Sequence, residues 1–241
     1  MKKRLWVSIT LIVLAGVSWR SLAADPNVQY RLVDLGTLGG PNSYLPYWYV
    51  AYTFTPQALA TDGTFAGWAD TLDSDPYVPC FWDCYVDRAF RWKDGVRTPL
   101  LALPGPPGLS AASSWISSNG LIVGFSENGE IDPYLAAPAV HAVLWQNDQV
   151  VDLKTLAREG GYESLATAVN SRGQVVGFAS NAASDPNSLQ FNTQTRAFLW
   201  QSGVMQDLGT LGGSSDAEAF YINEQGQIIG QASPQLTANV K

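Results

Sequence analysis

Side chains capable of acid–base, nucleophilic or metal chemistry are unevenly represented in this sequence. Its 241 residues include one histidine, His141, together with two cysteines and 21 acidic residues. A hydrolytic triad needs a base and a His/Cys metal centre needs several ligands, so both are disfavoured. His141 also takes the place that Arg88 and Arg196 hold in two related segments, which indicates a polar structural role. Carboxylates are therefore the groups left to act on a substrate or to hold a cation, and no catalytic residue is assigned.

Three of the carboxylates recur in the same dipeptide. Each Asp-Pro pair begins eight residues after a glycine that closes a repeated segment, and the aspartates are Asp75, Asp132 and Asp185. Asp-Pro typically begins a turn. Carboxylates presented by equivalent loops could also bind Ca²⁺, which prefers oxygen ligands, with Asp70 and Asp73 adding ligands in the first segment. Both interpretations stay open, and no other cofactor is expected.

Aromatic residues are concentrated between Gly40 and Pro56. This segment interrupts the repeat described below and contains Tyr44, Tyr47, Trp48, Tyr49, Tyr52 and Phe54. Flat rings can stack on sugars or on a protein surface, which makes Tyr47, Trp48 and Tyr49 the candidate ligand-binding residues. The alternative is that these rings fold over a sheet edge and cover it.

The two cysteines lie four positions apart, as Cys80 and Cys84, in a segment that also contains Pro76 and Pro79. In an oxidising compartment this spacing favours a local disulfide that closes a small loop. A redox-active pair more often reads C-x-x-C, and a metal site would need further Cys or His ligands.

The first 24 residues read as a secretory signal peptide. Lys2, Lys3 and Arg4 precede an apolar run from Leu5 to Val17, and small residues follow before Asp25. An uncleaved anchor is the alternative, but a spanning helix needs about 20 apolar residues, more than this run supplies. The sequence therefore predicts a mature chain of residues 25–241 without a membrane span, located outside the cell or in the periplasm.

The net charge limits the partners. Residues 1–24 hold four of the 14 basic residues and none of the 21 acidic ones, so the predicted mature chain carries a net charge of −11. An acidic protein is a poor ligand for nucleic acid and for anionic lipid surfaces. The 46% of hydrophobic residues and a mean hydropathy of −0.02 are typical of a globular chain.

One pattern repeats through residues 25–241. A block ending in glycine closes at Gly67, Gly124, Gly177 and Gly230, with spacings of 57, 53 and 53 residues. A second block, ending in tryptophan, follows the first three glycines as Arg88–Trp92, His141–Trp145 and Arg196–Trp200. A third block contains Asp-Leu and occurs as Val33–Gly40, Val150–Leu153 and Met205–Gly213. The repeat units run approximately over 41–100, 101–153, 154–208 and, incompletely, 209–241.

Each unit predicts four short antiparallel strands. The Asn170–Gly173 turn joins a first strand to a second, a longer loop leads to a third, and a Gly203 turn leads to a fourth. A four-stranded sheet repeated in tandem cannot bury its faces alone, which is typical of a β-propeller blade. The predicted fold is therefore all-β and propeller-like, with about three complete blades and a partial one; a β-sandwich is the alternative.

The blocks resemble the HAF-repeat family of bacterial extracellular proteins. The matching motifs are Asp-Leu-Gly-Thr-Leu-Gly-Gly at Asp34–Gly40 and Asp207–Gly213, and Ile-Asn-x-x-Gly-Gln-x-x-Gly at Ile222–Gly230. The His-Ala-Phe tripeptide is altered in all three copies, as Arg-Ala-Phe, His-Ala-Val and Arg-Ala-Phe. The resemblance implies secretion and a repeat fold, and it implies no established activity.

Closure of the predicted propeller has two solutions. The last unit has only its first two strands, and Tyr30–Leu35 could pair with it as a fourth strand to complete a small ring. Otherwise the chain leaves an exposed sheet edge that needs a partner and permits self-association.

These features favour a secreted, non-enzymatic repeat protein that binds an extracellular protein or glycan. The competing class is an extracellular carbohydrate-active or other hydrolase that uses carboxylates on the rim of the repeats.

Overall fold

A computed structural model describes residues 32–46, 57–147, 149–156, 161–185, 188, 192–212 and 216–232. The described residues from Leu35 onward belong to one compact unit. The described residues contain fourteen β-strands and no helix, which confirms the all-β prediction. None of them forms a helix that could cross a membrane. The predicted signal peptide and the candidate ligand residues Tyr47, Trp48 and Tyr49 lie outside the described residues.

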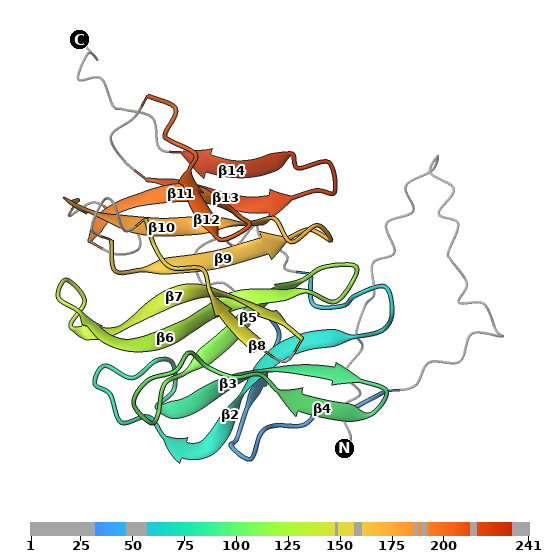
Figure 1. The fold of residues 1–241 in the computed structure, drawn as a ribbon. Helices are drawn as coiled ribbons and strands as arrows, with labels where there is room; N and C mark the ends of the chain where they lie inside the picture. The colour runs from blue at the N-terminus through green and yellow to red at the C-terminus, as the bar shows by residue number, and fades with distance from the viewer. Residues whose placement is uncertain are drawn as a thin grey trace, which may run out of the picture. The chain divides into compact units, whose positions relative to one another are not determined.

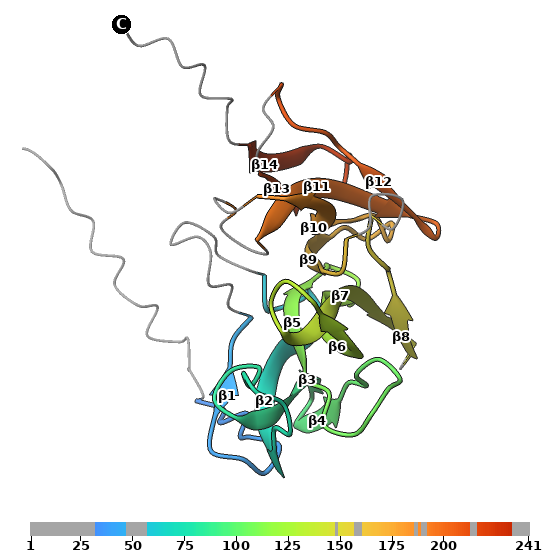
Figure 2. The same cartoon turned by 90° about the vertical axis from the view of Figure 1, so that its left-hand side faces the viewer.

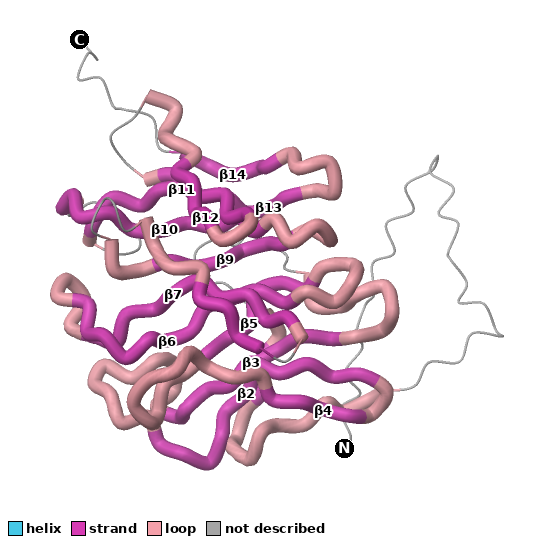
Figure 3. Tube along the Cα trace, viewed as in Figure 1, coloured by secondary structure: helices cyan, strands magenta, loops and turns pink. Residues whose placement is uncertain are grey.

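The strands form four antiparallel sheets that follow the order of the chain (Figures 1 and 3). The first sheet contains β1 (Ser43–Tyr44), β2 (Phe65–Ser74), β3 (Tyr85–Lys93) and β4 (Val96–Pro99). The second contains β5 (Ala111–Ile116), β6 (Ile122–Asp132), β7 (Ala137–Gln146) and β8 (Gln149–Asp152). The third contains β9 (Ser164–Val169), β10 (Val175–Ser184), β11 (Thr193–Gln201) and β12 (Val204–Asp207). The fourth contains β13 (Ala217–Ile222) and β14 (Ile228–Ala232).

The register repeats from sheet to sheet. The closing glycine of the second strand pairs with the same position of the third strand, as Gly67 with Phe90, Gly124 with Val143 and Gly177 with Phe198. Three four-stranded units and a two-stranded one therefore occur where the repeat predicts them.

The aromatic segment interrupts the first strand of the first unit. The two residues of β1 pair with β2. Beyond residues 47–56, Leu59 forms an isolated antiparallel bridge with Phe65 of β2. The Ala66 amide donates to the Ala58 carbonyl at 2.9 Å, which continues the same ladder. The described residues on both sides of residues 47–56 therefore pair with the same strand, β2.

The opening Asp-Leu block differs from the prediction. Residues 32–42 form no strand, and the Leu35 carbonyl accepts a hydrogen bond from Arg97 of β4 at 2.6 Å. No described strand therefore includes residues 33–35, where a fourth strand was expected. Leu35 is instead bonded to the first sheet, and closure of a ring by Tyr30–Leu35 stays a prediction.

Hydrophobic clusters join residues of successive sheets, and Figure 2 shows these sheets one after another in the order of the chain. One joins the first and second sheets through Ala89 and Ile116, another joins the second and third through Leu144 and Phe198. A third joins Val176 of the third sheet to Ala217 of the fourth. Each sheet therefore buries its faces against its neighbours in the chain, as a tandem repeat requires.

The repeated tryptophans follow this arrangement. Trp145 belongs to the cluster between the first and second sheets, and Trp200 packs on the cluster between the second and third. Each tryptophan thus packs toward the sheet that precedes its own. Trp92 lies in the first sheet, where no described sheet precedes it, and it is only half-buried.

The closing glycines are required by a close approach of two strands. A β-bulge shifts the ladder at Val176 and Gly177 of β10 and brings the Leu165 carbonyl onto the α-carbon of Gly177. A methyl group there would overlap that oxygen, and the same overlap occurs at Gly124 and Gly230. The recurrence of glycine follows from this packing and needs no positive φ.

Gly177→Ala should therefore lower the free energy of unfolding by about 2–4 kcal/mol, because the new methyl group has to displace backbone. Gly203→Ala is the control: that glycine has a φ of 86° in a turn with open space around it, and its replacement should cost about 1 kcal/mol. Denaturant unfolding of both variants measures the difference. Equal losses would contradict the close-approach explanation.

Candidate functional site

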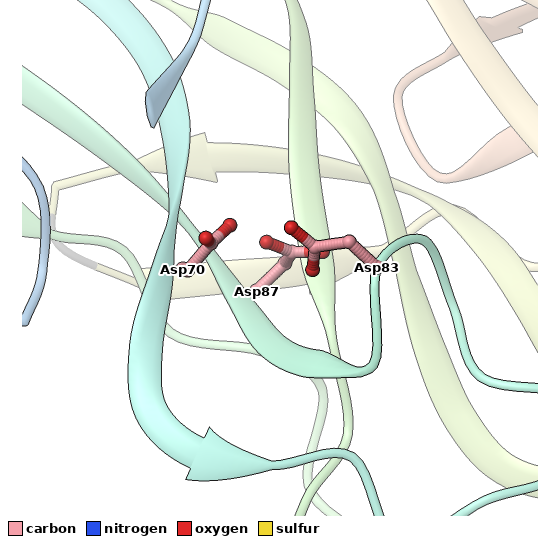
Figure 4. Close-up of side chains that lie close together, drawn as sticks. All are labelled: Asp70, Asp83 and Asp87. Atoms are coloured by element: carbon pink, nitrogen blue, oxygen red, sulfur yellow. The ribbon is translucent and has the colours of Figure 1, made fainter. Parts of the chain in front are cut away.

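Three carboxylates from the first sheet and its long loop converge in the structure. Asp70 of β2, Asp87 of β3 and Asp83 of the loop each place an oxygen within 4.8 Å of the others' oxygens. Figure 4 shows the three side chains pointing toward one another. Asp70 and Asp87 are fully buried and Asp83 is half-buried.

The sheet register produces this convergence. Asp70 and Asp87 are directly paired across the β2–β3 ladder, so their side chains project from the same face. The register shifts immediately after that pair, between Asp70 and Ser74, and the chain leaves the ladder. The loop then returns with Asp83 just before β3 begins at Tyr85.

A disulfide closes the part of the loop that carries Asp83. Cys80 and Cys84 are bonded, with a Cα–Cα distance of 5.0 Å, as the spacing of the two cysteines predicts. Trp82 lies in the same closed loop and is 47% exposed. The disulfide thereby restricts the positions that Asp83 and Trp82 can take.

Only part of the carboxylate cluster is supplied with hydrogen-bond donors. Asp83 Oδ2 accepts from Tyr44 Oη at 2.9 Å and from Asn42 Nδ2 at 3.1 Å. Asp70 Oδ2 accepts from the Asn42 amide at 2.8 Å. Asp70 Oδ1 and both oxygens of Asp87 are buried without a hydrogen-bond partner among the described residues.

Electrostatic repulsion within the cluster is strong. Burial, followed by the negative charge of Asp70, raises the pKa of Asp87 to about 8. Burial and the bond to Asp83 also raise the pKa of Tyr44. The ion pairs found among the described residues involve other acids, namely Asp62, Asp152 and Asp207. The cluster therefore has to hold a proton or a cation near neutral pH.

Aromatic rings adjoin the carboxylates. Tyr44 stacks on Trp68 with ring centroids 4.0 Å apart, and Trp82 meets both rings edge-on at 6.5 and 6.1 Å. Trp82 is thus the exposed member of a group of three aromatic rings. Tyr44, another member of the group, donates a hydrogen bond to Asp83.

A second set of buried acids lies in a pocket of about 230 Å³. The pocket is lined by Phe81, Phe125 and Leu165 with Glu127 and Glu163. Burial raises the pKa of Glu127 to about 7, with a smaller contribution from Asp75. Burial also raises the pKa of Glu163 to about 9, opposed by a backbone hydrogen bond and increased by Asp132.

Equivalent positions in the repeat explain these glutamates. Glu163, Ser110 and Asp216 each stand immediately before the first strand of a unit. Each accepts a backbone amide from the third strand of the preceding unit: Glu163 from Val140 at 2.7 Å, Ser110 from Asp87 at 3.0 Å and Asp216 from Thr195 at 2.9 Å. These side chains therefore link one sheet to the next.

A second acceptor position lies three residues after each closing glycine. Glu127 accepts the Ser110 amide at 2.6 Å, Ser180 Oγ accepts the Glu163 amide at 3.0 Å, and Asp70 accepts that of Asn42. A serine oxygen accepts the hydrogen bond in one unit and a carboxylate oxygen accepts it in the others. The interaction common to this position is therefore a hydrogen bond from a backbone amide.

The contacts of His141 are also explained by an equivalent position in another unit. Its Nδ1 lies 3.0 Å from Asp152 Oδ1, and its Nε2 lies 3.0 Å from Asn128. At the equivalent position of the next unit, Arg196 pairs with Asp207 at 3.0 Å. In the first unit Pro99 stands where the other units have Asp152 and Asp207, and Arg88 instead donates to the Leu109 carbonyl. The histidine thus takes part in a cross-strand pair that arginine makes elsewhere.

The candidate calcium ligands lie in three separate loops. Asp75 accepts the amides of Tyr77 and Phe81, both at 2.8 Å. Asp132 accepts those of Tyr134 and Leu135 at 2.6 and 3.3 Å. The Asp185 amide donates to the Asn192 carbonyl at 3.1 Å. Of the predicted calcium ligands, Asp70 alone belongs to the described cluster of three carboxylates that could share one ion, and calcium binding by the Asp-Pro loops stays a prediction.

Asp83 and Asp87 were missed by the analysis of the sequence, although one signal was present. Asp87 stands where the other units have Val140 and Thr195, so a charged residue replaces uncharged ones in the third strand. Asp83 gave no signal of its own, because the loop around it has no counterpart in the other units.

Comparison with protein families, with curated proteins and with solved structures finds no match to this chain.

Glu163→Gln should remove a pH dependence of stability. A folded-state pKa of about 9, above the ordinary 4.5, means that the folded protein holds this proton more tightly, so stability falls as pH rises between these values. The variant should gain about 4 kcal/mol over wild type in going from pH 5 to pH 8. Exposed Glu130→Gln is the control, and denaturant unfolding at both pH values is the measurement. Identical pH profiles for wild type and Glu163→Gln would contradict the assignment.

His141→Arg should keep the free energy of unfolding within about 0.5 kcal/mol, because arginine makes the equivalent pair with Asp207 in the next unit. His141→Leu should lose about 1 kcal/mol, since it leaves the half-buried Asp152 without this partner. Thermal unfolding distinguishes the two, and equal losses would show that the position requires histidine itself.

Proposed function

We propose that this chain is an exported, non-enzymatic binding module whose tandem sheets are arranged as in a propeller. Support for export comes from the pattern of residues 1–24, and support for the arrangement comes from equal units that pack in chain order. The repeat blocks are those expected of the HAF-repeat type. The proposed ligand is an extracellular glycan, with an extracellular protein as the second candidate.

One observation carries the non-enzymatic part of the proposal. Glu127, Glu163 and His141 are the groups best suited to acid–base chemistry, and each makes a contact that a serine, an aspartate or an arginine makes at the equivalent position of another unit. A side chain that makes the same contact as its equivalents in other units has a structural role in the repeat. Catalysis would require a departure from that pattern at these residues.

The departures occur instead in the loops between second and third strands, where exposed apolar side chains collect. The ends of the second strands and the loops that follow them in the first two units, together with the segment before β9, expose Leu72, Val78, Trp82, Ile131, Tyr134 and Tyr162. Tyr134 and Tyr162 come from different units and meet edge-on with centroids 6.3 Å apart. Exposed rings beside carboxylates suit the stacking and hydrogen bonding through which proteins bind sugars.

The hydrolase alternative rests on the pocket that holds Glu127 and Glu163. Raised pKa values in an apolar pocket are what a general acid needs. Both glutamates are almost fully buried, and each has an oxygen engaged by a backbone amide.

A sheet edge is a second surface available for binding. Among the described residues, β14 pairs only with β13, whereas second strands in the other units also pair with a third. An unpaired strand edge can accept a strand from another molecule, which makes self-association a proposal for this chain.

Trp82→Ala should weaken glycan binding at least tenfold, because an exposed ring is the stacking surface of the proposed site. The experiment screens the purified chain for glycan binding and for hydrolysis, and then measures affinity for the best ligand. Val204→Ala, which changes an exposed apolar residue at the start of the fourth strand of another unit, is the control and should bind like wild type. Turnover of a glycan that is lost in Glu163→Gln would overturn the proposal in favour of the hydrolase.

A further inference from the structure

We propose that Asp70, Asp83 and Asp87 bind one Ca²⁺ ion between β2, β3 and the disulfide loop. This site is distinct from the Asp-Pro positions of the repeat and does not depend on whether the chain binds a glycan.

The geometry of the three carboxylates suits a shared ion. Calcium–oxygen distances are about 2.3–2.6 Å, so two ligands of one ion lie at most about 5 Å apart. One oxygen from each aspartate lies within 4.8 Å of the others, and all three carboxylates face a common point (Figure 4).

The unpartnered oxygens are an independent indication. Asp87 is fully buried, its carboxylate is directed into the cluster, and neither of its oxygens has a hydrogen-bond partner in the described part of the chain. Asp70 Oδ1 is also buried and has no hydrogen-bond partner among the described residues. A buried charged group without a partner is costly, and a cation held by these three oxygens would supply the missing interaction.

The surrounding hydrogen bonds leave ligand atoms available. Asn42 and Tyr44 hold one oxygen of Asp83, and the Asn42 amide holds one oxygen of Asp70. These contacts orient the two carboxylates while Asp87 keeps both oxygens for bidentate binding. Carboxylates that bind a metal ion are usually held in place by hydrogen bonds from neighbouring groups in this way.

The ligand set selects a hard cation. All three candidate ligands are carboxylates, and neither histidine nor a free cysteine is among them. Oxygen ligands favour Ca²⁺ and Mg²⁺ over zinc or copper. Calcium is the better match because it accepts irregular geometry and bidentate carboxylates, whereas Mg²⁺ requires a nearly octahedral shell. Half-buried Asp83 leaves a side from which water can complete the coordination.

Binding would connect the fold to its most exposed loop. The ion would join two central strands to the loop closed by Cys80 and Cys84, next to the exposed Trp82. The competing arrangement is a single proton shared by Asp70 and Asp87, which would satisfy the same oxygens without any metal.

The test titrates the purified full chain, freed of metal with EGTA, with Ca²⁺ and Tb³⁺. Calorimetry should give one Ca²⁺ per chain, and saturating Ca²⁺ should raise Tm by about 5 °C or more. Excitation of Trp68 and Trp82, whose rings lie beside the cluster, should sensitise Tb³⁺ luminescence that Ca²⁺ competes away. Asp87→Asn should weaken Ca²⁺ binding at least tenfold and remove the rise in Tm.

Three further variants make the result decisive. Asp83→Asn changes the half-buried loop ligand and should show the same loss even if Asp87→Asn does not fold. Glu130→Gln and Asp132→Asn should bind Ca²⁺ like wild type. The proposal is overturned if no saturable binding occurs up to about 10 mM Ca²⁺. It is also overturned if Asp87→Asn and Asp83→Asn bind like wild type, or if Asp132→Asn alone loses binding. Finally, a higher Tm of metal-free Asp87→Asn without any calcium effect in wild type would support the shared proton.

Discussion

Each sheet of this chain is bonded to the next through a side-chain oxygen that accepts a buried backbone amide. Ser110, Glu163 and Asp216 occupy this position in successive units, and their partners are amides of third strands in the preceding units. A buried amide without an acceptor is costly, so the bond specifies how neighbouring sheets meet as well as adding stability. Hydrophobic clusters fill the space on either side of this contact. The order of the sheets, and the loops they bring together, follow from it.

The use of acids as acceptors has an electrostatic consequence. Serine satisfies a buried amide without carrying charge, whereas Glu127 and Glu163 have pKa values raised by the same burial. Their perturbed titration is a property of a structural position and resembles that of catalytic acids. The repeat allows the two explanations to be compared, since equivalent positions with different residue types reveal which interaction every unit shares.

The first unit departs most from this plan. It has an insertion within its first strand, a disulfide in the loop between β2 and β3, and an acid at Asp87 where other units have uncharged residues. These departures meet around one carboxylate cluster beside exposed Trp82. Residues that differ from their equivalents in other units are not explained by the contacts that all units share. For this reason Trp82 of the proposed ligand surface and the proposed calcium site are both assigned to the first unit.

The sequence by itself determined the all-β class, the order of the strands within the repeat units, and the Cys80–Cys84 disulfide. These depend on local signals: alternating apolar residues, glycine turns and a short cysteine spacing. It also marked the closing glycines, although the reason for them, a carbonyl of the first strand lying against Gly177, appears only in three dimensions. The convergence of Asp70, Asp83 and Asp87 was decided by tertiary structure alone. It depends on a cross-strand register and on the return of an irregular loop, and neither is encoded in the spacing of residues 70, 83 and 87 along the chain.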